Sequence, residues 1–244
     1  MNTLCGMTHE DLLALKAEKV FWLLTARDMM YLAKTLNAFW TYDYEAATQG
    51  RVGMHALLKS GRHSDGFFES KILLAPENIR SIIAHQIVWQ LQALDIPAPN
   101  YVAGVPNGAT LLGESIAEML RVPVARLEKV DGQIILAAEI PKGATLLLVE
   151  DFCTRGTGFT EAVTEVKRRQ PPARFMPYAP VIVNRGSLKE ISVEGVGSFE
   201  ILPVVEWRIE DWDPTDCPLC VRGSEVIKPK VSAENWQMLT TSQV

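Results

Sequence analysis

The stretch that decides the fold of this 244-residue chain covers residues 145–158 and reads TLLLVEDFCTRGTG. Residues 145–149 form a continuous apolar run, which is typical of a central parallel strand covered on both faces. Two acids, Glu150 and Asp151, end this run, and a loop with Thr and Gly leads into a helical pattern over Thr157–Arg169. The stretch therefore predicts a buried strand, a polar loop and a helix, in that order.

Helical and extended patterns alternate on both sides of this stretch. Further helices are predicted at 76–94 and 109–120, and further strands at 101–105, 122–127, 134–137, 180–183 and 201–205. The turn between the strands predicted at 122–127 and 134–137 falls on Asp131-Gly132, a dipeptide favoured in tight hairpins. Such alternation predicts an α/β fold with three layers, a central mainly parallel sheet and right-handed crossovers.

The two ends of the chain lie outside this alternation. Apolar residues recur at helical spacing over 8–40, and the motif T-x-x-D, at 8–11 and 25–28, matches a capping box, so we expect two helices there. Their Met and aromatic stripe indicates core packing or a dimer contact rather than a cofactor site. The predicted organisation is an N-terminal helical extension over 1–50, an α/β domain over 51–210 and an irregular tail over 211–244.

Composition excludes several classes of protein. Hydrophobic residues make up 48% of the chain, so it is not mainly disordered, and the net charge of −5 does not favour a nucleic-acid partner. No apolar run approaches the roughly 18 residues of a membrane span, and the first residues lack a secretory pattern. We therefore expect a cytoplasmic protein with no nucleic-acid and no membrane partner.

The cysteines give only a weak metal signal. Four of them are too few for a disulfide scaffold. Cys217 and Cys220 supply half of a tetrahedral zinc site, but the four histidines show no spacing of a second ligand pair. We therefore predict no metal ligands, with structural zinc as the less favoured alternative.

Polar side chains and glycines follow two of the predicted strands, at 104–110 and 150–158. Ligands of open α/β sheets bind outside the carboxyl ends of the strands, where these segments fall. Neither segment is a P-loop or a dinucleotide fingerprint. In the second, amides at a helix start suit a phosphate, and Glu150 and Asp151 can accept hydrogen bonds from two sugar hydroxyls. A ribose 5-phosphate fits, although helix caps use the same residue types, so this loop alone leaves both interpretations open.

Two motifs make a family resemblance specific. Residues 146–157, LLLVEDFCTRGT, resemble the phosphoribosyl-diphosphate signature of type I phosphoribosyltransferases. Residues 58–68, LKSGRHSDGFF, resemble a segment of the orotate phosphoribosyltransferases within that family. The resemblance covers roughly residues 52–205. It implies the three-layer type I phosphoribosyltransferase-like fold, and transfer of a phosphoribosyl group to a pyrimidine base, with orotate as the expected base.

The resemblance also implies roles for individual residues. The expected catalytic residues are Lys59, Asp151 and Lys129. The expected substrate-binding residues are Phe67 and Phe68 beside the pyrimidine, Asn107 and Gly108 at the diphosphate, Glu150 and Asp151 at the ribose hydroxyls, Thr154, Arg155, Gly156 and Thr157 around the 5-phosphate, and Arg185 at the orotate carboxylate. Mg²⁺ is expected to arrive with the diphosphate, because hard oxygen ligands suit it. The family resemblance further implies a homodimer.

Two departures from the family pattern keep other functions open. The loop at 104–108 has no lysine for the diphosphate. The segment 126–142, where the orotate enzymes carry a basic mobile lid, holds only Arg126, Lys129 and Lys142 as basic residues and has no histidine. The alternatives are a non-catalytic regulator that binds phosphoribosyl diphosphate, or a phosphoribosyltransferase that acts on another base.

Overall fold

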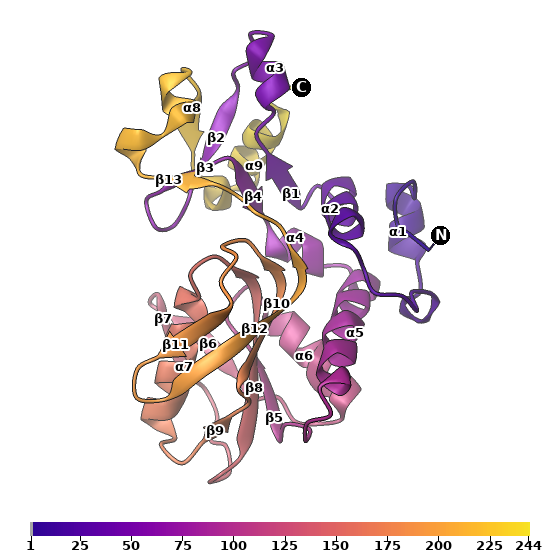
Figure 1. Ribbon diagram of the computed structural model, residues 1–244, viewed down its shortest axis with the longest axis vertical. Coiled ribbons are helices and arrows are strands. Elements are labelled where there is room, and N and C mark those ends of the chain that lie inside the picture. The colour runs from indigo at the N-terminus through magenta and orange to yellow at the C-terminus, as the bar shows by residue number, and fades with distance from the viewer. Residues whose placement is uncertain (1) are drawn as a thin grey trace. The chain divides into compact units, whose positions relative to one another are not determined.

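The computed structural model describes residues 2–244, which divide into two compact units (Figure 1). The first unit contains the chain up to Leu32 together with Ser70–Trp207. The second contains Ala33–Glu69 and Arg208–Val244. The boundaries predicted at 50/51 and 210/211 differ from this division, because segments far apart in the sequence pair with each other in the second unit. Within residues 2–244, no helix is long and apolar enough to cross a bilayer.

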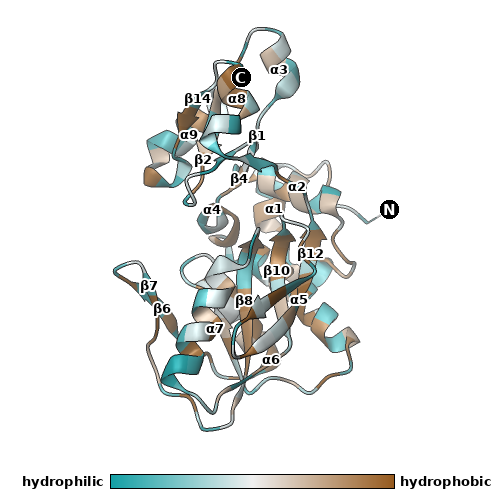
Figure 2. Ribbon diagram, turned by 60° about the vertical axis from the view of Figure 1, so that its left-hand side comes forward, coloured by the Kyte–Doolittle hydropathy of each residue, from teal (hydrophilic) through white to brown (hydrophobic). Residues whose placement is uncertain are grey.

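A mainly parallel sheet forms the centre of the first unit, as predicted. Its strands run in the order β11-β12-β10-β8-β5, and β9 pairs with β8. Their bounds are β5 Tyr101–Gly104, β8 Thr145–Cys153, β9 Arg174–Phe175, β10 Tyr178–Asn184, β11 Glu190–Val193 and β12 Gly197–Glu206. Strands β5, β8, β10 and β12 are parallel to one another, and β11 is an antiparallel edge strand. Figure 2 shows the central strands largely in the colour of hydrophobic residues.

Helices cover both faces of this sheet (Figure 1). Helices α4 Ser70–Leu74, α5 Glu77–Ala93 and α6 Thr110–Leu120 precede β8, and α7 Thr157–Arg169 follows it. In β8, Leu146 and Leu148 pack in one cluster with Phe159 of α7. Leu147 and Val149 are equally buried, and since side chains alternate along a strand they face the other side, toward α5 and α6. This arrangement confirms the three-layer α/β fold.

The N-terminal segment forms two α-helices, α1 His9–Ala14 and α2 Ala26–Thr35, with a short 3₁₀ turn, η1 Ala17–Lys19, between them. Both predicted capping boxes are present, at Thr8 and at Thr25. The helical prediction for residues 36–40 is wrong. Asn37 adopts a left-handed conformation with φ of 52° beyond the end of α2, which redirects the chain into a strand.

The second unit contains a sheet in the order β13-β3-β2-β14 and a two-stranded pair, β1 with β4. Its elements are β1 Phe39–Thr41, α3 Tyr44–Thr48, β2 Met54–Leu57, β3 His63–Ser64, β4 Gly66–Phe68, β13 Asp211–Trp212, η2 Pro214–Asp216, α8 Pro218–Val221, β14 Glu225–Ile227, η3 Pro229–Val231 and α9 Ala233–Thr241. The predicted irregular tail over 211–244 is therefore wrong. Its strands have only two or three residues, too few for a sequence pattern, and they form by pairing with β2 and β3.

A hairpin of β6 Leu127–Val130 and β7 Gln133–Leu136 projects from the first unit. Asp131 and Gly132 both have positive φ, 50° and 83°, as the predicted tight turn requires. The strand predicted at 122–127 does not form and leaves a single bridge at Val124. Pro123 has no N–H to donate to a ladder, which accounts for the difference.

Candidate functional site

The acidic pair at the end of β8 divides between the two faces of the sheet. The Glu150 carboxylate lies against Gly158 in the first turn of α7, where an added Cβ would stand 2.6 Å from Oε1. The Asp151 carboxylate lies against Gly108, in the loop between β5 and α6, and a Cβ there would overlap it. Glycine at both positions leaves room for the carboxylates, and a larger residue would displace them from these places.

Glu150 has an unusual electrostatic environment. Its side chain is buried, and its Oε2 atom has no hydrogen-bond partner within the described residues. Burial raises the pKa of this carboxyl to about 8, the Asp151 carboxylate adds to the increase, and the Arg185 guanidinium opposes it. The Oε2 atom is therefore available to accept a hydrogen bond from a ligand group.

The loop after β8 leads directly into the N-terminus of α7. Gly156 is the N-cap residue, with φ of 67°, and it has no side chain to cap the helix, but the Phe159 amide in the first turn donates to the Glu150 carboxylate. The N-terminus of a helix of this length carries partial positive charge, which favours an anion beside it. Arg155 and Thr157 are exposed in the same loop, so both can reach a ligand placed there.

Arg185, at the end of β10, contacts this loop. Its Nε and Nη2 atoms donate to Oγ1 of Thr154 at 3.1 and 2.7 Å. Gly186, the next residue, lies so close to the Thr154 carbonyl that a Cβ would overlap it. Arg185 thus supports the predicted phosphate loop directly, and the expected contact with an orotate carboxylate stays a prediction.

The loop between β5 and α6 completes this end of the sheet. Gly104 packs against the Ala109 carbonyl with no room for a side chain, and the Pro106–Asn107 peptide bond is cis. Asn107 is exposed and Gly108 half-buried beside Asp151. The structure therefore brings the two chemistry-bearing loops of the sequence together in the first unit, as expected from the rule that ligand crevices lie at strand ends.

Three expected site residues belong to the second unit. Lys59 is exposed in the tight turn between β2 and β3, where Leu58 N donates to the Arg62 carbonyl at 2.8 Å. Phe68 stacks on Phe39 with a centroid distance of 4.2 Å. Both Phe67 and Phe68 are buried, so their rings are covered within this unit. Contacts of these residues with a pyrimidine stay predictions.

Several curated proteins are similar in sequence to this chain. No protein-family model matches the chain. The curated orotate phosphoribosyltransferase of a Nitratiruptor species is 29% identical over 185 residues, which cover 72% of this chain and 90% of the relative. The one of Wolinella succinogenes is also 29% identical over 185 residues, with coverage of 72% and 88%. Over most of its length the chain is therefore similar to curated orotate phosphoribosyltransferases.

Two solved structures have a fold similar to that of this chain. The crystal structure of orotate phosphoribosyltransferase from Aeropyrum pernix has a TM-score of 0.52 and 20% identity, and the match covers 73% of this chain and 93% of that one. The structure of Leishmania donovani UMP synthase has a TM-score of 0.51 and 18% identity, and the match covers 85% of this chain and 40% of the larger protein.

The sequence alone did not identify some residues of the candidate site. Gly158 leaves room for the Glu150 carboxylate, and Gly186 leaves room for the Thr154 carbonyl. Their position just after the end of a predicted strand is the sequence feature that could have identified them. Asn184 is buried at the end of β10 with no partner for its Oδ1 atom in the part of the chain that is described. No sequence pattern identifies Asn184 as a candidate, because only its burial in the folded chain distinguishes it.

Proposed function

We propose that this protein transfers the 5-phosphoribosyl group of phosphoribosyl diphosphate to orotate, giving orotidine 5′-monophosphate and diphosphate in pyrimidine nucleotide biosynthesis. The observation that carries the proposal is the buried Glu150 carboxyl with its unpartnered Oε2 atom, beside Asp151 and the N-terminus of α7. This combination suits a ribose with two hydroxyls and a phosphate. The names of the curated relatives support orotate as the base.

The chemistry requires positioning and electrostatic stabilisation and no covalent enzyme intermediate. Glu150 and Asp151 would accept hydrogen bonds from the ribose hydroxyls, and the amides at Gly156 and Thr157 would hold the 5-phosphate. The loop at 104–108 would receive the leaving diphosphate, with Lys59 and Lys129 as the candidate cations. Stabilising charge on the leaving group as the bond to the ribose breaks is the dominant catalytic demand.

Mg²⁺ is part of the proposal as an ion that arrives with phosphoribosyl diphosphate. The half-buried Asp151 carboxylate, beside Asn107 and Gly108, offers the oxygen ligands that Mg²⁺ prefers where the diphosphate would lie. Bound there, the ion would supply positive charge to the leaving group. We also propose a homodimer in the cytoplasm.

One observation favours a different function, a regulator that binds phosphoribosyl diphosphate without turnover. The β6–β7 hairpin occupies the place in the sequence of the basic lid, yet Lys129 is its only basic residue. A lid with so little positive charge gives weak stabilisation to a leaving diphosphate.

The loss of orotate absorbance, measured with Mg²⁺ and phosphoribosyl diphosphate, tests the proposal. Turnover by the wild-type protein that stops without phosphoribosyl diphosphate supports it. Asp151→Asn should lose activity, and Glu118→Gln, an exposed substitution on α6, is the folded control and should keep it. Tight binding of phosphoribosyl diphosphate in calorimetry with no turnover of any base favours the regulator. Turnover of another base alone moves the protein to a different substrate.

A further inference from the structure

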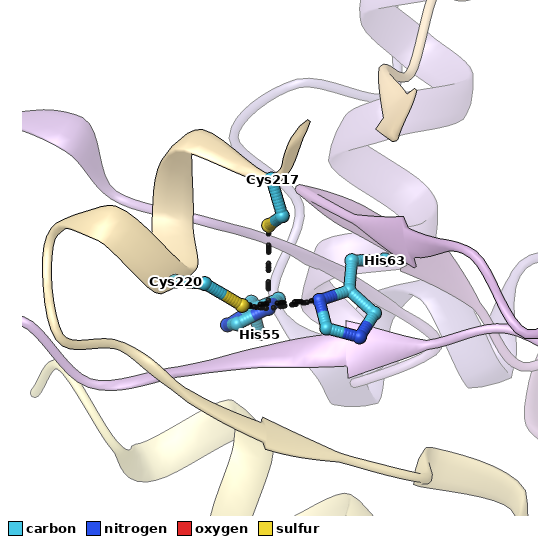
Figure 3. A group of neighbouring side chains, drawn as sticks. All are labelled: His55, His63, Cys217 and Cys220. Atoms are coloured by element: carbon cyan, nitrogen blue, oxygen red, sulfur yellow. Dashed lines mark hydrogen bonds between the residues drawn. The ribbon is translucent and has the colours of Figure 1, made fainter. Parts of the chain in front are cut away.

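Four side chains that the proposed function does not use meet in the second unit (Figure 3). His55 lies on β2 and His63 on β3, while Cys217 and Cys220 flank and enter the short helix α8. Their potential ligand atoms all lie within 4.8 Å of one another. The sequence separates the histidine pair from the cysteine pair by more than 150 positions, so the fold brings them together.

Four of the six distances between the ligand atoms are close to the edges of a tetrahedron around a metal ion. His55 Nε2 lies 3.0 Å from His63 Nδ1, 3.5 Å from Cys217 Sγ and 3.6 Å from Cys220 Sγ. Cys220 Sγ lies 3.2 Å from His63 Nδ1. Zinc with two sulfur and two nitrogen ligands places sulfur and nitrogen about 3.5 Å apart and its two nitrogens about 3.3 Å apart.

The surrounding residues orient one ligand for metal binding. His55 Nδ1 lies 2.9 Å from Ser224 Oγ, and Ser224 Oγ donates to the Gly53 carbonyl at 3.1 Å. Because the hydroxyl proton of Ser224 is used on that carbonyl, its oxygen accepts the Nδ1 proton of His55. This leaves the lone pair of His55 on Nε2, which faces both sulfurs. Such an outer hydrogen bond is the usual support of a histidine that binds a metal.

Burial and charge define the type of site. His55, His63 and Cys217 are buried, with exposed fractions of 0%, 7% and 1%, and Cys220 closes the exposed side. Two thiolates would balance the double charge of Zn²⁺, so the complex with two neutral imidazoles has no net charge to bury. Four protein ligands leave no open position for a substrate, which is the mark of a structural zinc site.

We propose that His55, His63, Cys217 and Cys220 bind one structural Zn²⁺ ion. The ion would join the β2–β3 hairpin to the C-terminal segment. A second link lies beside it, because Arg62 of the hairpin pairs with Asp211 and, at 2.6 Å, with Asp213. The turn that carries Lys59 lies between His55 and His63 in the sequence, so the zinc would also fix the base of that turn.

Metal analysis of the full-length protein, purified without chelator, is the first test. We expect about one zinc ion per chain, and cobalt substitution should give the absorption of a tetrahedral site with thiolate ligands. These measurements on the wild-type protein do not depend on the activity, so their failure leaves the proposed function untouched. Absence of zinc, or a Cys217–Cys220 disulfide found by mass spectrometry of the unreduced protein, would overturn the proposal.

Matched cysteine variants are the second test. Cys220→Ser should lose the zinc and lower the midpoint of thermal unfolding by roughly 10 °C. Cys5→Ser is the control, because Cys5 lies in the first unit, and it should retain the zinc and the midpoint. If Cys220→Ser fails to fold, the metal content and the cobalt spectrum of the wild-type protein still show whether the chain binds zinc at a site with thiolate ligands. Zinc retained at full stoichiometry by a folded Cys220→Ser variant would place the ion elsewhere and refute the site.

Discussion

Glu150→Gln should make the protein more stable at neutral pH and a poorer binder of its ligand. The wild-type carboxyl has a pKa of about 8 in the folded state because of its burial, against 4.5 for the unperturbed group. The folded state therefore holds its proton more tightly than the unfolded state. By linkage, the free energy of unfolding falls as the pH rises from about 4.5 to about 8.

The size of the effect follows from the same two values. Each pH unit within this window costs about 1.4 kcal/mol, so wild-type protein at pH 7 has lost roughly 3 kcal/mol of stability through this one group. Glutamine has nearly the same shape and no charge to bury, so the variant avoids this loss. Part of the gain is offset where the amide finds no acceptor. Wild type and variant should converge below the unperturbed pKa, where Glu150 is protonated in both the folded and the unfolded state.

Urea unfolding at several pH values between about 5 and about 8 measures this difference. The stability gap between Glu150→Gln and wild type should widen steadily with pH, while Glu118→Gln should follow the wild-type curve. Affinity for phosphoribosyl diphosphate, measured by calorimetry, should fall about tenfold in Glu150→Gln, since an acceptor for a ribose hydroxyl is replaced by an amide. Stability curves of Glu150→Gln and wild type that run parallel across this range would contradict the raised pKa of Glu150 in the folded state.

Three further substitutions test the other parts of the site. Asp151→Asn should weaken phosphoribosyl-diphosphate binding by about ten- to a hundredfold, because a charge-assisted hydrogen bond is lost, and unchanged affinity in calorimetry would contradict the ribose role. Gly108→Ala should reduce kcat/KM by about tenfold or more with the far-ultraviolet circular dichroism unchanged, since the new Cβ displaces the Asp151 carboxylate, and normal kinetics would show that the loop has room. Arg185→Lys should raise the KM for orotate by about tenfold, because an ammonium cannot grip a carboxylate with two parallel hydrogen bonds. A change confined to phosphoribosyl-diphosphate affinity would instead assign Arg185 to holding Thr154.

Local patterns predicted the first unit well. The apolar run of β8, the helix over Thr157–Arg169 and the Asp131-Gly132 turn all follow from side-chain chemistry within a few residues, and the structure contains each of them. The position of the two loops after β5 and β8 could also be predicted, because parallel strands place their carboxyl ends along one edge of the sheet. The division of Glu150 and Asp151 between two faces also follows from strand alternation.

Long-range pairing explains what the sequence could not predict. Strands β13 and β14 are too short to show a period and exist because Trp212 pairs with His63 and Val226 with His55. The His55 and His63 spacing matches no common metal motif, so only the folded hairpin shows that both imidazoles face the cysteine pair. The burial of Phe67 and Phe68 depends in the same way on partners elsewhere in the chain, Trp236 and Phe39.

Transfer of a phosphoribosyl group to orotate is the proposed activity of this site. The most direct measurement follows orotate absorbance with wild-type protein, Mg²⁺ and phosphoribosyl diphosphate, and identifies the product by mass spectrometry. We expect a loss of absorbance that requires phosphoribosyl diphosphate, with orotidine 5′-monophosphate formed in equal amount. Orotate left intact by a folded protein that still binds phosphoribosyl diphosphate would contradict it.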